Sequence, residues 1–181
     1  MNLIYKTFKH IKTILIHKYW VAHYCFQLGL YWRGLVHDLS KFHPVEFLES
    51  IKYYSGTDSP INLCKKDKGY SLAWLHHKGR NTHHYEYWID YLDSGGKPIR
   101  MPINDIKELV CDWIAAGKTS MGENFTFSKE AKYVVNKLMS ANIHSDTTMS
   151  IVAVFTKLMI SKNPEADFKE IVESNVDSET R

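Results

Sequence analysis

Apolar residues recur at intervals of three and four along most of the chain, which is the spacing of one face of an α-helix. The first such run includes Leu3, Phe8, Ile11 and Leu15 and continues to Gly29. It predicts one long helix, or two helices with a bend, that begins the core. A helix lying on a membrane surface is the less favoured alternative. No segment alternates apolar and polar residues as a half-buried strand does.

Glycine and proline residues divide the rest of the chain into further helices and loops. Helical spacing is found at residues 31–38, 44–54, 70–78, 85–94, 104–117, 129–142 and 148–160, with a last short helix opening at Asn163–Pro164. Residues 56–69 and 95–102 have loop composition. The expected helix starts are Pro102 or Asn104, a Ser128 cap, and an Asp146 or Thr147 cap.

This pattern predicts an all-α fold, a single helical bundle of about seven to nine helices over residues 1–181. The motifs described below fall within about 15–118, and the C-terminal helices within 128–176. The tail, 177–181, is expected to be frayed.

Composition fits a globular domain, with 44% hydrophobic and 24% charged residues in 181. The net charge of +3 is mild and the basic residues are spread out, so a nucleic-acid partner is not favoured. Charged residues interrupt every apolar stretch well before the roughly 20 residues of a membrane span. The N-terminus also lacks the features of a signal peptide, and no membrane partner is expected.

The three cysteines, Cys25, Cys64 and Cys111, are odd in number and widely spaced. This pattern argues against a disulfide framework and against a thiolate zinc site, and it fits a reducing cytoplasm.

A histidine and an aspartate stand side by side in the segment GLVHDLSKFH, as His37 and Asp38. Alone, the pair could be the polar end of a helix. A metal site needs further ligands, and His17 upstream and Asp112 in the apolar segment LVCDWIAAG are compatible with that role. A buried acid such as Asp112 is costly unless it is paired or bound to metal. His23 is the rival of His17.

Four more histidines lie in LHHKGRNTHHYEYW, as His76, His77, His83 and His84. Two histidine pairs across a short turn can project onto a common ion. A polar surface turn without any ligand is the alternative. His43, before a proline, is interpreted as a helix cap or loop residue.

The order of His17, then His37–Asp38, then Asp112, on an all-α scaffold, resembles the HD-domain metal-dependent phosphohydrolases. The segments HKYWV, GLVHDLSK and LVCDWIAAGK carry the likeness, which covers about residues 15–118. The chain is also similar to an uncharacterised bacterial and phage family of small HD-type proteins.

The resemblance implies a metal site formed by the four residues above. In members with two metals, His77 and one of His83 or His84 would add ligands and Asp38 would bridge the ions. These histidines lie closer together here than in those members, which leaves the number of ions open. His76 and His77 are alternatively substrate contacts.

Phosphoester chemistry then suggests roles for the nearby basic residues. Metal would activate water and polarise a phosphoryl oxygen, while Lys41 or Arg80 would offset developing charge. His76, Lys78 and Arg80 are candidate substrate-binding residues, and an ordinary solvated role for Lys41 is the alternative. Manganese, iron, cobalt, nickel and zinc all suit such ligands.

The expected function is metal-dependent hydrolysis of a nucleotide or another small phosphoester, in the cytoplasm of a bacterium or of a phage host. A di-iron HD-type oxygenase is one alternative. The other is a non-catalytic module that binds a nucleotide or a protein and uses metal as a structural staple.

Overall fold

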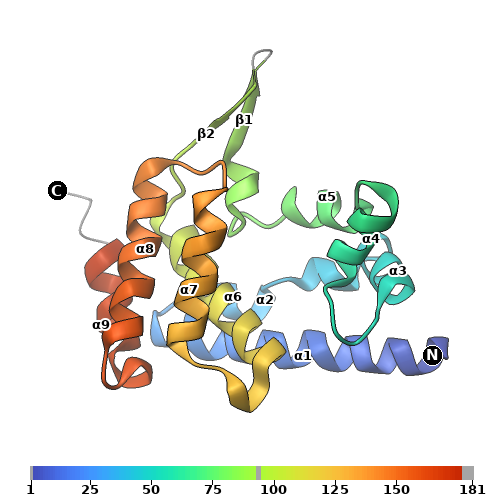
Figure 1. The fold of residues 1–181 in the computed structure, drawn as a ribbon, viewed down its shortest axis with the longest axis horizontal. Coiled ribbons are helices and arrows are strands. Elements are labelled where there is room, and N and C mark those ends of the chain that lie inside the picture. The colour runs from blue at the N-terminus through green and yellow to red at the C-terminus, as the bar shows by residue number, and fades with distance from the viewer. Residues whose placement is uncertain (1, 93–94, 177–181) are drawn as a thin grey trace.

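The computed structural model of the chain describes residues 2–92 and 95–176. Within these residues the fold has nine α-helices, three short 3₁₀ helices and one two-stranded hairpin (Figure 1). The α-helices are α1 (Leu3–Gln27), α2 (Tyr31–Val36), α3 (Pro44–Tyr53), α4 (Pro60–Lys68), α5 (Leu72–Lys78), α6 (Ile103–Met121), α7 (Phe127–Met139), α8 (Ser145–Ile160) and α9 (Pro164–Val176). The expected all-α fold is confirmed.

Helices α1 and α6 pack along each other and form the centre of the fold. On α1, Val21, Tyr24 and Cys25 are fully buried, and on α6 nearly every residue from Asp105 to Ala115 is buried. Helices α7, α8 and α9 cover α6 on one side, while α3, α4 and α5 pack together near the N-terminal end of α1 (Figure 1). Side chains on α1 and α6 therefore face the space between these two groups of helices.

Helix α1 is one continuous helix, which ends just before Gly29 takes a left-handed conformation with a φ of 73°. The following helix, α2, approaches α1 closely at Gly34. A Cβ atom on Gly34 would lie 2.9 Å from Cβ of Cys25, so this approach requires glycine. The close packing of α2 on α1 fixes the position of the His37–Asp38 pair that follows it. No helix in the described part of the chain is long and apolar enough to cross a membrane.

Sequence expectations are wrong for three segments in the middle of the chain. Residues 60–68, expected to be a loop, form α4, with Pro60 in its first turn and Gly69 as a left-handed C-cap. Residues 85–92, expected to be helical, form the 3₁₀ helix η2 (Tyr85–Trp88) and strand β1 (Ile89–Leu92).

Strand β1 pairs antiparallel with β2 (Gly95–Pro98), in a segment expected to be a loop, with Ile89 opposite Pro98 and Asp90 opposite Lys97. Residues 89–92 form a strand instead of the expected helix because they pair with β2. Aromatic and β-branched residues such as those of β1 favour strands. Residues 93 and 94 of the expected helix lie outside the described residues.

Several helix starts also differ from the expected ones by one to three residues. Thr126, not Ser128, caps α7, and His144, not Asp146 or Thr147, caps α8. Helix α6 starts at Ile103 after Pro102 without a side-chain cap. The start of α9 at Pro164 is confirmed, and His43 caps α3 as interpreted. The tail 177–181 lies outside the described residues.

Candidate metal centre

The candidate ligands come from four separate regions of the chain and converge on one buried location. His17 lies on α1, Asp112 lies on α6, and His37 and Asp38 form the turn between α2 and the 3₁₀ helix η1 (Leu39–Phe42). His77 lies on the last turn of α5, and His83 and His84 precede η2. All seven side chains predicted from the sequence as metal ligands therefore belong to two adjoining groups.

The first group contains His17, His37, Asp38 and Asp112, all of them buried. Nε2 of His17 lies 3.0 Å from Oδ1 of Asp112, and Nε2 of His37 lies 3.3 Å from the same oxygen. His37 Nε2 also lies 3.3 Å from Oδ2 of Asp38. His23, the alternative to His17, is exposed and contacts Gln27.

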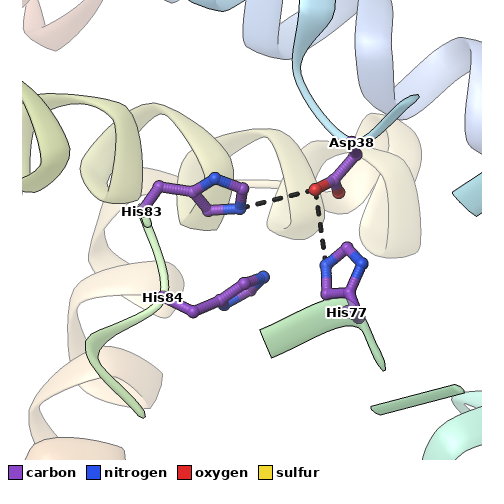
Figure 2. A group of neighbouring side chains, drawn as sticks. All are labelled: Asp38, His77, His83 and His84. Atoms are coloured by element: carbon purple, nitrogen blue, oxygen red, sulfur yellow. Dashed lines mark ion pairs between the residues drawn. The ribbon is translucent and has the colours of Figure 1, made fainter. Parts of the chain in front are cut away.

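The second group contains Asp38, His77, His83 and His84. Figure 2 shows His77 and His83 directed at the same oxygen of Asp38, His77 from α5 and His83 from the segment before η2. The ring of His84 lies between them and points toward Asp38. Nε2 of His77 lies 3.3 Å from Oδ1 of Asp38, and Nε2 of His83 lies 3.5 Å from it. Both His83 and His84 belong to the group, where the resemblance implied only one of them.

Asp38 is shared by the two groups, and its two oxygens are divided between them. Oδ2 faces His37 of the first group and Oδ1 faces His77 of the second. Its backbone is left-handed, with a φ of 54°, and Asp38 is the one described non-glycine residue with a positive φ. This conformation is uncommon outside glycine and asparagine-like residues, and strained backbone of this kind clusters at functional sites.

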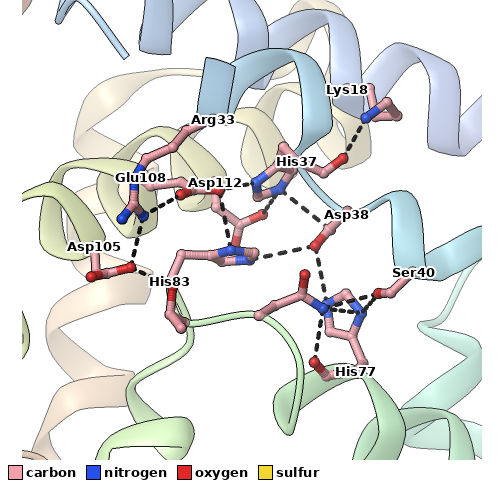
Figure 3. Close-up of polar contacts among 12 residues, drawn as sticks. Lys18, Arg33, His37, Asp38, Ser40, His77, His83, Asp105, Glu108 and Asp112 are labelled. Carbon is pink, nitrogen blue, oxygen red and sulfur yellow. Dashed lines mark hydrogen bonds and ion pairs between the residues drawn. The ribbon is translucent and has the colours of Figure 1, made fainter. Parts of the chain in front are cut away.

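Glu108 on α6 contacts one histidine of each group, on the side of the ring away from Asp38 (Figure 3). Its Oε1 lies 2.8 Å from Nδ1 of His37 and 3.3 Å from Nδ1 of His83. The three residues are close enough to be considered a third ligand group. However, both rings present Nδ1 to Glu108 and keep Nε2 toward Asp38, so Glu108 orients the two ligands, as carboxylates do behind metal-bound histidines.

Further polar residues hold these carboxylates in place. Nη1 of Arg33 lies 2.9 Å from Oε2 of Glu108 and 2.7 Å from Oδ1 of Asp105 (Figure 3). On the other side, Glu46 accepts hydrogen bonds from Nδ1 of His76 at 2.5 Å and of His77 at 2.8 Å. Asp105, Glu108 and Glu46 are thereby paired, which is the condition for burying a charge.

The atoms that face the centre, in contrast, approach one another without the geometry of a hydrogen bond. They are Nε2 of His17, His37, His83 and His84, and Oδ1 of Asp38, all of them buried. Unpaired buried polar atoms are rare in native proteins because each one costs free energy. Imidazole nitrogens and carboxylate oxygens converging in this way fit a divalent transition metal.

The ionisation of the two carboxylates also suits a cation at this location. Burial alone would raise the pKa of the Asp38 carboxyl, but His37 and Lys41 outweigh it and hold this pKa well below its usual range. The pKa of Asp112 is also held well below its usual range, because His17 and His37 outweigh its burial. Both carboxylates are therefore ionised at neutral pH and can act as ligands.

A cavity of about 490 Å³ opens onto the centre. Its wall includes His17, Asp38, His77, His84 and Asp112 among the candidate ligands, together with Lys41. Nζ of Lys41 lies 2.7 Å from Oδ2 of Asp38. The cavity extends along α1 and α6 to residues 56–59, which lie between α3 and α4, and to the first two residues of α4.

Three other predicted site residues do not line this cavity. Arg80 is exposed in the turn after α5, and Lys78 is half-buried on that helix. His76 turns its Nδ1 to Glu46, and its ring stacks on His43 with 4.3 Å between the ring centroids. The structure therefore places Lys41 at the centre and leaves these three residues away from it.

Sequence reasoning missed the residues behind the ligands. Asp105, Glu108 and Asp112 are spaced by three and four along an otherwise apolar helix, and this spacing puts them on one face. That spacing was the available signal for Glu108. No local pattern in the sequence ties Glu46 to His77, 31 positions later.

A family model described as "Family of unknown function (DUF5662)" matches residues 6–157. No curated protein and no solved structure matches the chain. The matched region includes every residue of the two ligand groups and extends through most of α8. The chain therefore belongs to the DUF5662 family.

Proposed function

We propose that the protein is a metal-dependent phosphohydrolase that acts on a small phosphoester such as a nucleotide. The observation that carries the proposal is the pair of ligand groups that share Asp38, with Lys41 beside them on the cavity wall. The resemblance of the motif order to HD-domain phosphohydrolases supports the same reaction.

The residues present fit one or two divalent transition metals. His17, His37, Asp38 and Asp112 would hold one ion, and Asp38, His77, His83 and His84 a second. A bound ion of this kind supplies a water of lowered pKa and polarises a phosphoryl oxygen. The chemistry of the ligands suits manganese, iron, cobalt, nickel and zinc.

Lys41 is the side chain best placed to meet a phosphate group. Burial would lower the pKa of Lys41, but Asp38 and then Asp112 outweigh it and raise this pKa, so the amine stays charged. A fixed positive charge at this position offsets the negative charge that develops on phosphoryl oxygens. Lys41 would thus bind substrate and stabilise the transition state.

The rest of the cavity suits an uncharged organic group. Apart from the histidines and the residues already described, its wall is formed by neutral side chains such as Thr13, Ser50, Tyr54 and Thr119, with Asp58 as the one remaining charge. His10 also lines it, and burial followed by the charge of Lys41 lowers the pKa of His10 to about 4, so this ring is neutral. One lysine matches one phosphate, which favours a phosphomonoester over a triphosphate.

The test combines elemental analysis of the purified protein with a panel of phosphoesters in the presence of the metal found. We expect bound transition metal and phosphate release, fastest from a monoester. In Asp38→Asn, where asparagine tolerates the left-handed backbone, metal content and activity should both fall. In Lys41→Gln, metal should stay while activity falls by about 10²-fold or more. Lys157→Gln, on an exposed position of α8, is the control.

A second candidate function is a di-iron oxygenase, which the convergence of all seven histidine and aspartate ligands also favours. Iron near two per chain together with oxygen uptake would support it. Protein that binds metal but neither releases phosphate nor consumes oxygen would refute both enzymes and leave a structural metal.

A further inference from the structure

The outward face of α1 carries a row of apolar side chains that are exposed or half-buried. This row, the α1 stripe, consists of Ile4, Phe8, Ile11, Leu15 and Tyr19, of which Phe8 is 70% and Tyr19 63% exposed. The spacing of four, three, four and four keeps all five on one face of the helix. A shallow groove runs along the stripe beside Lys12. A continuous row of exposed apolar side chains of this kind is a candidate interaction site.

The α1 stripe lies on the side of the helix away from the metal centre. Phe8 precedes the buried His10 by two residues, and Leu15 precedes the buried His17 by two. Two residues turn an α-helix by about 200°, so Phe8 and Leu15 point nearly opposite to the two buried histidines. No residue of the stripe lines the cavity at the metal centre. A partner on the stripe would leave this cavity open.

Aromatic side chains extend the same surface beyond the stripe. Phe26 near the end of α1 is partly exposed, and its ring contacts that of Tyr31 on α2 with 5.5 Å between the centroids. Tyr31 and Trp32 are both exposed, Trp32 at 73%. Tyrosine and tryptophan rings combine an apolar body with a polar edge, and they are enriched where an apolar phase meets water.

The charged side chains of residues 1–37, which carry this surface, have one sign. Residues 1–37 contain five basic residues and no acidic one, so Asp38 is the first acid of the chain. The whole chain has 23 basic and 20 acidic residues, so residues 38–181 have 18 basic and 20 acidic residues. The net charge is therefore +5 for residues 1–37 and −2 for residues 38–181. Lys9 and Lys12 are exposed on α1 itself. A second copy of this face would bring like charges together without any acid to pair them.

We propose that the α1 stripe binds the surface of an anionic lipid bilayer, with α1 lying in the plane of the surface. The apolar side chains would enter the acyl boundary, and the lysines beside them would reach the lipid headgroups, as in other interfacial helices. The charge favours this partner over a second copy, and a row of apolar side chains along one face of a long helix suits the planar surface of a bilayer. The proposal replaces the expectation of no membrane partner.

Sedimentation with lipid vesicles tests the proposal. The full chain is mixed with phosphatidylcholine vesicles that either contain or lack phosphatidylglycerol. We expect binding to the vesicles with phosphatidylglycerol, weaker binding to those without it, and release by salt. In the double variant Phe8→Glu/Leu15→Glu, binding should fall by more than about tenfold, because two apolar side chains no longer enter the bilayer. Lys9→Glu/Lys12→Glu should lower binding to the anionic vesicles alone.

The matched control is Met139→Glu/Met149→Glu, which places the same charges on exposed positions of α7 and α8 and should bind vesicles like the wild type. Circular dichroism verifies that each variant is folded. Equal binding to both kinds of vesicle, or unchanged binding of both α1 variants, would overturn the proposal. So would a dimer in light scattering that the Phe8→Glu/Leu15→Glu variant dissociates while vesicles stay unbound. Because phosphate release is not measured, failure of the proposed enzyme activity would not affect this test.

Discussion

Replacing Glu108 with glutamine removes an acceptor from the middle of a three-way contact. Oε1 of Glu108 faces Nδ1 of His37 at 2.8 Å and of His83 at 3.3 Å, while Oε2 faces Arg33 at 2.9 Å. All three partners are donors. A glutamine amide has one acceptor oxygen and an NH₂ group, so in either orientation the NH₂ group faces a donor. Glu108→Gln therefore leaves at least one histidine or Arg33 without an acceptor.

The expected effect is a loss of metal affinity rather than of folding. Residues that hold the second nitrogen of a ligand histidine typically contribute 10- to 100-fold to metal affinity, which is about 1.4 to 2.7 kcal/mol. Glu108 serves a histidine of each ligand group, so affinity at both ions should fall. The charge loss adds to this effect, because the burial of Glu108 is outweighed by His37 and His83 and its pKa lies well below the usual range.

The assay is metal competition against a chromophoric chelator, with Glu123→Gln on an exposed position as the control. Folding of both variants is checked by circular dichroism. Wild-type affinity in a folded Glu108→Gln variant would refute the reasoning that Glu108 orients His37 and His83. Loss of a single ion with the other unchanged would show that the carboxylate serves one ligand group only.

Three stability predictions concern other buried contacts. Burial raises the pKa of Glu130 from 4.5 to about 7, so the folded state binds a proton that the unfolded chain releases, and stability falls as pH rises between these values. At pH values above about 7, Glu130→Gln should therefore raise the free energy of unfolding by at most about 3 kcal/mol, with a higher Tm. Below about pH 5 the variant should be as stable as the wild type. Gly117→Ala places a Cβ in collision with the Glu130 carboxylate and 2.9 Å from a ring carbon of Phe125, and urea unfolding should show a loss of about 1–3 kcal/mol. Thr147→Val leaves the buried N–H of Met101 without its 3.1 Å acceptor, and Tm should fall by the equivalent of about 1–3 kcal/mol, whereas Thr148→Val serves as the neighbouring control.

Much of the fold could be predicted from the sequence because helices are encoded locally. The spacing of apolar residues predicts α1, α6 and α8 within a few residues of their observed bounds. The hairpin was missed because it depends on pairing between Ile89 and Pro98 and their neighbours, and pairing between strands leaves only a weak pattern in either one. The α4 helix was missed because its polar residues, Lys65 to Lys68, resemble those of a loop.

The candidate ligands could be predicted because their residue types are rare in apolar surroundings. An acid such as Asp112, flanked by apolar residues in a helix, needs a partner, and its neighbours in the sequence suffice to indicate this need. Arg80 was placed at the site because it follows His77 closely, but the sequence does not determine the direction of a side chain after a turn. The bond between Glu46 and His77 joins residues on different helices, and only the tertiary structure reveals it.

Helix α6 carries Asp105, Glu108 and Asp112 on one face, and this arrangement limits which insertions and deletions the helix tolerates. One inserted or deleted residue rotates the helix beyond it by about 100° and shifts it by about 1.5 Å. Such a change between Glu108 and Asp112 would separate the candidate ligand Asp112 from Glu108, which contacts His37 and His83. Members of the family that keep the centre should therefore align without gaps across this helix. A relative with a gap there would mark a lineage that has lost it.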